Sequence, residues 1–210
     1  MNAPQLDLTG QTPLAKGGGR LVYAHPDRAD LIVKVPRIKP RRKAWRVSPS
    51  LGFGRGAFGP QWNTFVEVRE LARATGRVGH VSRAFAAFGG FINTTLGAAA
   101  LFDAIRADTG DLAPTLRAHA EATGLEDSME QAITALWDRI EADWLVVSDR
   151  ALVNCVVTGS TDKGYDLTLI DGIGERTFVP LKSMSRRIHA RKCAQFCDAM
   201  LANYRTVAGA

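Results

Sequence analysis

The segment from Leu145 to Gly174 constrains the fold of this chain more than any other. It reads LVVSDRALVNCVVTGSTDKGYDLTLIDGIG. Residues 152–157 and 165–170 are short apolar runs, and the residues between them are mostly turn formers. Two apolar runs joined by such a turn are typical of a β-hairpin. The chain is therefore expected to contain an antiparallel strand pair near its C-terminal third.

Polar side chains flank this predicted hairpin. In antiparallel pairing the start of the first strand lies beside the end of the second, so Asn154 is expected next to Asp171. Their oxygens suit Mg²⁺, which usually takes one or two protein ligands and completes its shell with phosphates and water. Asp149 lies just upstream and could orient or deprotonate an attacking hydroxyl. Asp and Asn are also common in plain turns, but the Asp-x4-Asn spacing followed by a strand that ends in Asp-Gly favours a functional interpretation.

Size and charge limit the function classes. The 210 residues allow one domain or two small lobes, and the net charge of +6 favours anionic partners such as nucleotides, phosphorylated substrates, nucleic acid or acidic lipid. The three cysteines, Cys155, Cys193 and Cys197, are an odd number and give no disulfide framework. Cys155 falls inside a predicted strand and is expected to be inert core packing.

Neither the N-terminal residues nor the apolar stretch of the chain predicts membrane insertion. Residues 1–14 lack the basic start and apolar core of a signal peptide. Residues 84–102 carry no charge and approach membrane-span length. We expect Gly89–Gly90 and the polar residues that follow to divide this run into two strands, Ala84–Phe88 and Leu96–Phe102. A cytoplasmic protein with a buried sheet and no membrane span is predicted.

A glycine turn and a lysine stand out near the N-terminus. Gly17, Gly18 and Gly19 precede an apolar run, and Lys34 interrupts the next one, Leu31–Val35. A lysine in a buried strand is costly unless it is paired, so Lys34 either reaches the surface or faces an anion. A glycine turn allows backbone N–H groups to approach phosphates, which a lysine can then neutralise.

Between this strand and the first predicted helix lies a strongly basic segment. Residues 36–61 contain seven Lys and Arg residues and no acidic residue. We expect a mobile loop, and consider nucleic-acid or lipid binding a less favoured alternative. The helix that follows, Trp62–Thr75, carries Glu67 and Glu70. One of them could pair with Lys34, whereas the other is expected to be a solvated helix charge.

The second half of the chain reads as mainly helical. Helices are expected over Leu112–Ala122, from a cap at Asp127–Ser128 onward, and over Lys182–Tyr204. Two apolar stripes at helical spacing predict core faces: Met129, Ile133, Leu136, Trp137, Ile140 and Trp144 in the first, and Ile188, Phe196, Cys197, Met200, Leu201 and Tyr204 in the second. Strands first and helices later indicate an α+β protein.

From about Pro13 to Cys197, apart from the basic loop, the sequence resembles the YrbL family of bacterial kinase-like proteins. The motifs that carry the resemblance are PLAKGGGRLVYAHPDRADLIVKV, ALFDAIRADTGDLAPTL and DLTLIDGIGERTFVPLKSMSRRIHARK. The resemblance implies a reduced protein-kinase-like fold in a single domain. A small β-rich N-terminal lobe (about 11–104, with the basic insertion 36–61) and a short helical C-terminal lobe (about 105–206) would surround an ATP cleft.

The resemblance also implies roles for individual residues. Glu67 fits the ion-pair partner of Lys34 better than Glu70, because Asn63 and Leu71 then fall where the family pattern has similar residues. The remaining positions correspond to the phosphate loop (Gly17, Gly18, Gly19), the strand lysine (Lys34), the hinge that grips adenine through its backbone (Asp103, Ala104, Ile105), the catalytic aspartate (Asp149) and the Mg²⁺ ligands (Asn154, Asp171).

Several positions depart from a full kinase pattern. The glycine turn is not G-x-G-x-x-G, Ala151 stands where protein kinases keep a lysine, and Gly172 replaces the phenylalanine after the metal aspartate. We therefore expect an ATP- and Mg²⁺-dependent phosphotransferase with an unidentified acceptor. The alternative is a nucleotide-binding pseudokinase that acts as a regulatory module on a partner. Nucleic-acid binding is the least favoured function.

Overall fold

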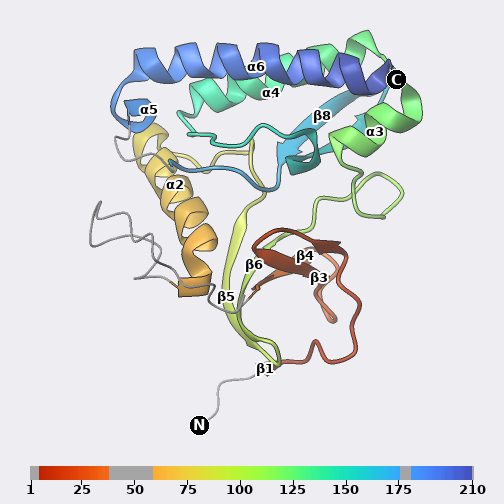
Figure 1. Ribbon diagram of the computed structural model, residues 1–210, viewed down its shortest axis with the longest axis vertical. Helices are drawn as coiled ribbons and strands as arrows, with labels where there is room; N and C mark the ends of the chain where they lie inside the picture. Colours follow the sequence, from red (N-terminus) through yellow and green to blue (C-terminus); the bar gives the residue numbers. More distant parts are fainter. Residues whose placement is uncertain (1–4, 38–58, 176–180, 210) are drawn as a thin grey trace. The chain divides into compact units, whose positions relative to one another are not determined.

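The computed structural model describes residues 5–37, 59–175 and 181–209. The chain forms two compact units. The first unit comprises Met1–Phe65 and Ala87–Ala104, and the second comprises Val66–Ala86 and Ile105–Ala210. Each unit is described separately below (Figure 1).

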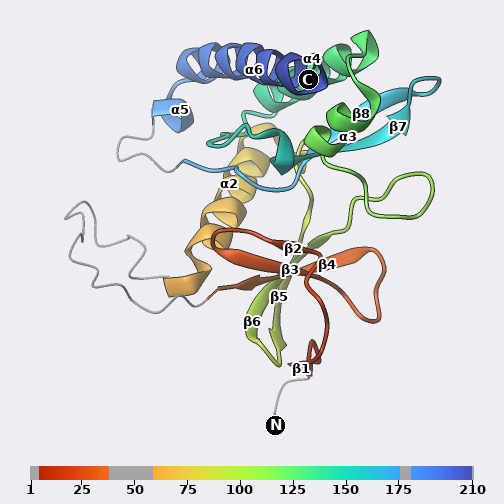
Figure 2. The same ribbon diagram turned by 45° about the vertical axis from the view of Figure 1, so that its right-hand side comes forward.

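The first unit is built on a six-stranded sheet in the order β1-β5-β6-β4-β3-β2. β1 pairs parallel to β5, whereas the other neighbours are antiparallel. Figure 2 shows β2, β3 and β4 following one another across this sheet. The bounds of its strands are β1 Gln5–Leu6, β2 Ala15–Lys16, β3 Arg20–Ala24, β4 Leu31–Pro36, β5 Phe88–Thr94 and β6 Gly97–Asp103.

One face of this sheet carries the core of the first unit. The core is a cluster of buried side chains from four parts of the unit, namely Leu8, Tyr23, Val33, Val35 and Ala99. β4 is buried along its whole length, as its nearly continuous apolar sequence requires. Because successive side chains alternate across a strand, Lys34 lies on the opposite face from Val33 and Val35.

The apolar run at 84–102 forms strands, but not with the predicted bounds. β5 begins at Phe88, where the first predicted strand was expected to end, and continues to Thr94. Gly89–Gly90 does not break the strand. The register shifts between Phe88 and Gly90, whose φ of 119° only glycine adopts readily, so the ladder continues through a bulge. In the parts of the chain that the structure describes, no helix has the length and apolar character needed to cross a membrane.

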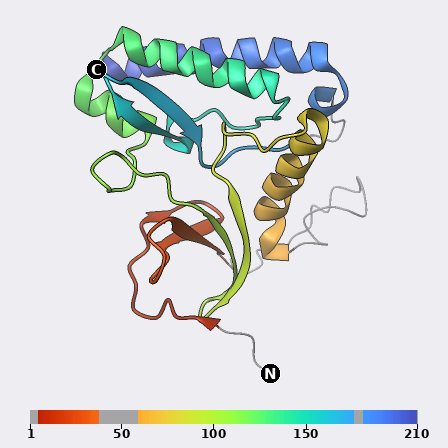
Figure 3. The ribbon, with the colours of Figure 1, turned by 180° about the vertical axis from the view of Figure 1, so that it is seen from behind.

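The second unit is mainly helical. Its elements are the part of α2 (Trp62–Val78) from Val66 onward, α3 Leu116–Thr123, α4 Asp127–Ala142, the 3₁₀ helix η2 Leu152–Asn154, β7 Cys155–Ser160, β8 Gly164–Leu169, α5 Leu181–Met184 and α6 Arg186–Ala208. α4 and α6 run side by side (Figure 1). The β7-β8 hairpin packs beside α4, as Figure 3 shows from behind. Strands early and helices late confirm the predicted α+β class.

The predicted helices exist, with corrected bounds. α2 confirms the helix expected over Trp62–Thr75. α3 begins at Leu116 rather than Leu112, because Thr115 caps it by accepting a hydrogen bond from the N–H of Ala118. The first apolar stripe is buried in α4 as predicted, except that Trp144 lies beyond the helix with a φ of 48°.

The last helix differs more from its prediction. Ser185 interrupts the expected helix and caps α6 by accepting a hydrogen bond from the N–H of Ile188. The fully buried positions of α6 are His189, Cys193, Met200 and Tyr204, so the predicted face is only partly right. A histidine was not expected on the core face, and its burial lowers its pKa from 6.5 to about 4. His189 is therefore neutral inside the protein.

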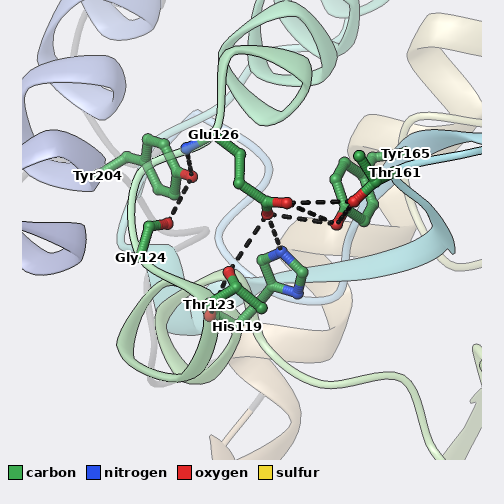
Figure 4. Close-up of polar contacts among 7 residues, drawn as sticks. All are labelled: His119, Thr123, Gly124, Glu126, Thr161, Tyr165 and Tyr204. Atoms are coloured by element: carbon green, nitrogen blue, oxygen red, sulfur yellow. Dashed lines mark hydrogen bonds and ion pairs between the residues drawn. The ribbon is translucent and has the colours of Figure 1, made fainter.

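The loop between α3 and α4 is held by a cluster of polar side chains (Figure 4). The hydroxyl of Tyr204 accepts a hydrogen bond from the N–H of Glu126 (3.1 Å) and donates one to the carbonyl of Gly124 (3.1 Å). The carboxylate of Glu126 contacts four side chains within 3.2 Å, those of His119, Thr123, Thr161 and Tyr165. These contacts join α3, α4, α6 and the tip of the β7-β8 hairpin.

Most of the predicted basic loop, residues 38–58, lies outside the residues that the structure describes. Of its ends, Pro36 belongs to β4, and the 3₁₀ helix η1 occupies Gly59–Gln61.

All three cysteines are free, and Cys155 is buried as expected, which raises the pKa of its thiol to about 12.

Candidate functional site

The predicted hairpin is present and places Asn154 beside the residues that flank Asp171. Its first strand starts at Cys155 rather than at residue 152, because Leu152–Asn154 forms η2. Cys155 pairs with Leu169, and the N–H of Ile170 donates to the carbonyl of Asn154 at 2.8 Å. The end of β8 therefore returns the chain to Asn154, as antiparallel pairing predicts.

Gly172 brings Asp149 into the same place. Its φ is 89°, and a Cβ atom at this position would lie 2.6 Å from the carbonyl oxygen of Asp149 and 3.4 Å from Nδ2 of Asn154. The carbonyl of Gly172 accepts hydrogen bonds from the N–H groups of Ser148 (2.8 Å) and Asp149 (3.0 Å). Only glycine combines this backbone conformation with this close approach. The structure thus assembles Asp149, Asn154 and the Asp171–Gly172 step in the second unit.

The side chains at this point are a set of hard oxygen donors. Oδ1 of Asp171 accepts a hydrogen bond from the N–H of Gly172 (2.6 Å), and Oδ1 of Asp149 accepts one from the N–H of Ala151 (3.0 Å). Asp149 is exposed, whereas Asn154 and Asp171 are half-buried. Within the described ranges, no three His, Cys, Asp or Glu side chains cluster as metal ligands. One amide and one carboxylate nevertheless fit Mg²⁺, which needs few protein ligands beside a nucleotide.

The two glutamates of α2 are both buried, so the expectation that one is a solvated charge is wrong. Glu67 and Glu70 each have 0% exposure. Oε1 of Glu70 accepts a hydrogen bond from the N–H of Val146 at 3.0 Å and lies 3.4 Å from Nη1 of Arg77. Burial raises the pKa of Glu70, although the Val146 N–H and Arg77 work in the opposite direction. Glu70 is thus engaged inside the second unit.

Lys34 is buried in the first unit instead of reaching the surface. Its exposure is 3%, and its Nζ lies 4.1 Å from the centroid of the Phe102 ring. The cross-strand neighbours of Lys34 are Val22 and Ala100. Because Glu67 belongs to the second unit, its pairing with Lys34 stays a prediction.

The glycine turn joins β2 to β3. The N–H of Gly17 donates to the carbonyl of Arg20 (2.9 Å), and the N–H of Arg37 donates to the carbonyl of Gly19 (2.9 Å). The N–H groups of Gly18 and Gly19 make no hydrogen bond with any residue that the structure describes. Two unpaired N–H groups on a turn are suited to an anion.

The predicted hinge residues lie where β6 ends. The N–H of Asp103 donates to the carbonyl of Ala87 (3.0 Å), and the N–H of Ala104 donates to the carbonyl of Asp30 (2.8 Å). Burial raises the pKa of Asp103, and Asp30 adds to the effect. In the described part of the chain, the N–H of Ile105 makes no hydrogen bond. This N–H is therefore the hinge donor that a ligand could use.

A comparison with protein-family models gives one match that spans nearly the whole chain. The model described as PhoP regulatory network protein YrbL matches residues 6–205. The chain belongs to the YrbL family. The resemblance seen in the sequence between Pro13 and Cys197 is thereby confirmed.

Other comparisons were made at the level of whole proteins and structures. No curated protein matches this YrbL-family chain. Among solved structures, it is similar to the Rio2 kinase–ADP/Mg²⁺–phosphoaspartate complex from Chaetomium thermophilum, with 12% sequence identity and a TM-score of 0.48. The match covers 95% of the YrbL-family chain and 61% of the Rio2 chain.

Sequence reasoning missed one group of residues near the site. Glu70 and Arg77 of α2 contact the backbone of residues 144–146, just before Asp149. The only signal in the sequence was the presence of two glutamates three residues apart on one helix face. That spacing does not show which glutamate turns toward which partner, because the answer depends on tertiary packing.

Proposed function

We propose that this YrbL-family protein has a reduced kinase-like fold, binds Mg·ATP and transfers the terminal phosphoryl group to a hydroxyl of an acceptor still to be identified. The observation that carries the proposal is Gly172, whose backbone brings Asp149 and Asn154 against the Asp171–Gly172 step. Phosphoryl transfer depends on positioning and on charge stabilisation more than on covalent chemistry. A compact group of one amide and two carboxylates is suited to both tasks.

In this proposal Asn154 and Asp171 hold the metal ion. Bound Mg²⁺ would supply positive charge that neutralises phosphate oxygens. Asp149 would orient the acceptor hydroxyl and take its proton as the oxygen forms a bond to the γ-phosphorus. The bond between that phosphorus and the bridging oxygen breaks, and ADP leaves. The exposure of Asp149 makes it accessible to an acceptor.

The first unit would supply the groups that bind the nucleotide itself. The N–H groups of Gly18 and Gly19 and the ammonium of Lys34 suit phosphate oxygens. Glu67 would hold Lys34, as the family resemblance implies. The unpaired N–H of Ile105 would serve adenine at the hinge formed with Asp103 and Ala104.

An assay of phosphate transfer and ATP hydrolysis tests the proposal, with Asp149→Asn as the matched variant. Asparagine keeps the size of the side chain but cannot accept the proton. We expect Mg²⁺-dependent turnover in the natural protein and a loss of at least about a hundredfold in Asp149→Asn. Equal activity in both proteins would contradict the assignment of Asp149.

A nucleotide-binding pseudokinase is the second candidate function. Two features favour it. The N–H of Gly17 in the glycine turn donates to the carbonyl of Arg20 and so cannot also bind phosphate, and Ala151 stands in place of a lysine. A regulatory module that acts on a partner also fits the family description, PhoP regulatory network protein. A rise of the melting temperature with Mg·ATP, lost in Asp171→Ala and accompanied by no turnover, would favour this function.

A further inference from the structure

The backbone that leads to Asp149 belongs to no helix or named strand, and contacts from other parts of the second unit hold it. Between Trp144 and Asp149, the N–H groups of Ser148 and Asp149 donate to Gly172. Three side chains also contact this backbone. Arg77 donates to the carbonyl of Trp144 (3.0 Å), Lys182 donates to the carbonyl of Val147 (3.0 Å), and Glu70 accepts from the N–H of Val146 (3.0 Å).

Val146 connects the two halves of the candidate metal site. Its N–H donates to Glu70, and its carbonyl accepts a hydrogen bond from the N–H of Gly174 at 2.7 Å. Asp149 lies three residues after Val146, and Asp171 lies three residues before Gly174. A shift of Val146 would therefore move both segments that carry the site.

Glu70 is well placed to prevent such a shift. It is fully buried on α2, and Arg77 of the same helix lies within 3.4 Å of its Oε1. Arg77 is itself held by the carbonyls of Trp144 and Ser183, both at 3.0 Å. Among the described residues, Glu70 is the only side chain that accepts a hydrogen bond from a backbone N–H between Trp144 and Asp149.

α2 also touches the second segment directly. Gly174 has a φ of 94°, and a Cβ atom there would meet Cγ1 of Val66 and lie 2.8 Å from the carbonyl oxygen of Val66. Val66 and Glu70 are one helical turn apart, so one face of α2 contacts both segments. The helix is thus a rigid support for the backbone on which Asp149 and Asp171 sit.

We propose that Glu70 is a positioning residue, which sets the affinity of the Asn154–Asp171 pair for Mg·nucleotide by holding Val146. This inference rests on the proposed function. Groups that orient metal ligands without touching the metal commonly change metal affinity ten- to a hundredfold, roughly, when they are removed. Glu70 acts in this way through the backbone, and its task differs from that of Glu67, which is assigned to Lys34.

The test compares Glu70→Gln with Glu70→Met. Glutamine keeps an oxygen that can accept the Val146 N–H, whereas methionine has a similar volume and no strong acceptor. We expect Glu70→Gln to bind Mg·ATP within about threefold of the natural protein and Glu70→Met to bind it at least about tenfold more weakly. Tyr204→Phe is the matched control, because it removes two partly buried hydrogen bonds elsewhere in the second unit.

Two readouts keep this inference separate from the proposed function. Titration with Mg·ATP gives the affinity, and amide hydrogen exchange reports the Val146 and Gly174 N–H groups with no nucleotide present. Natural affinity in Glu70→Met, or a loss in Tyr204→Phe as large as in Glu70→Met, overturns the inference. If the natural protein binds no nucleotide, the proposed function fails. Hydrogen exchange then tests the role of Glu70 by itself. Unchanged protection of the Val146 and Gly174 N–H groups in Glu70→Met would overturn the inference that Glu70 holds Val146.

Discussion

At the scale of single residues, Gly174, three residues after Asp171, leaves little room for change. Gly174 combines a φ of 94° with direct contact against Val66, whose carbonyl oxygen would lie 2.8 Å from an added Cβ atom. We predict that Gly174→Ala lowers the free energy of unfolding by more than about 3 kcal/mol, because backbone strain and a clash with backbone add together. Urea denaturation followed by circular dichroism measures the loss.

Gly164→Ala is the matched control for this prediction. Gly164 has a similar φ of 83°, but an added Cβ atom there meets nothing within 4 Å. Only the conformational cost remains, so a loss of about 1 kcal/mol is expected. Equal losses at the two positions would show that the contact with Val66 contributes nothing.

His189 makes the stability of the protein depend on pH. Its Nε2 lies 3.3 Å from the carbonyl oxygen of Ile140, and burial lowers its pKa from 6.5 to about 4. Between these two values the unfolded chain binds a proton that the folded protein does not, so stability falls as the pH falls from 6.5 and the loss levels off near 4. At about 1.4 kcal/mol per pKa unit, the full loss is about 3 kcal/mol.

The pH effect is isolated by comparing the natural protein with His189→Gln. The variant cannot titrate at this position, so its unfolding free energy should change less between pH 7 and pH 4. Chemical denaturation at several pH values measures both proteins. The same pH dependence in both would mean that His189 binds its proton as readily in the folded protein as in the unfolded chain.

At the scale of elements, local sequence patterns predicted the helices and the hairpin, but not the features that depend on a partner element. The stripe of α4 is buried as its spacing requires, and the hairpin follows from two apolar runs and a turn. Gly89–Gly90 was misjudged, because a glycine pair marks either a break or a bulge, and only the partner strand β6 decides between them. His189 could not be placed in the core from sequence, since its burial depends on the carbonyl of Ile140 from another helix.

The Glu126 cluster of Figure 4 gives a prediction about how helices and hairpin hold together. Burial alone would raise the pKa of Glu126, but hydrogen bonds, led by those from His119 and Tyr165, outweigh it and lower the pKa. Glu126→Ala leaves four polar side chains without their shared acceptor. We predict a loss of about 2 kcal/mol in the free energy of unfolding, measured by urea denaturation.

Glu130→Ala is the appropriate comparison, because it removes a carboxylate from the first turn of α4, next to Glu126, the N-cap residue of this helix. Glu130 contacts one partner, Arg205, whose side chain is 56% exposed. Exposed ion pairs contribute little to stability, so the loss should be clearly smaller than in Glu126→Ala. A larger loss of stability in Glu130→Ala than in Glu126→Ala would mean that the ion pair with Arg205 contributes more to stability than the Glu126 cluster does.

At the scale of the whole molecule, the arrangement of the candidate site could be predicted only for residues that are close in the sequence. Asp149, Asn154 and Asp171 lie within 23 residues of one another, and strand pairing brings them together. The roles of Glu67 and Glu70 depend instead on where α2 packs, and periodicity does not contain that information. The sequence predicts α2 as a single helix, yet its residues from Val66 onward belong to the second unit and its first residues to the first unit.

The charge of the molecule is concentrated in one segment. Residues 38–58 hold six Lys and Arg and no acidic residue, so replacing these six by glutamine takes the formal net charge from +6 to 0. We predict that any affinity for nucleic acid falls for all sequences alike and loses most of its salt dependence, because such binding depends on phosphate contacts.

The rise in melting temperature with Mg·ATP should remain when the basic segment is neutralised, since every proposed nucleotide and metal residue lies outside this segment. Retention on a polyanion column at two salt concentrations and a thermal-shift titration measure the two effects. Loss of the Mg·ATP shift in a variant that still folds would assign the basic segment to the nucleotide site.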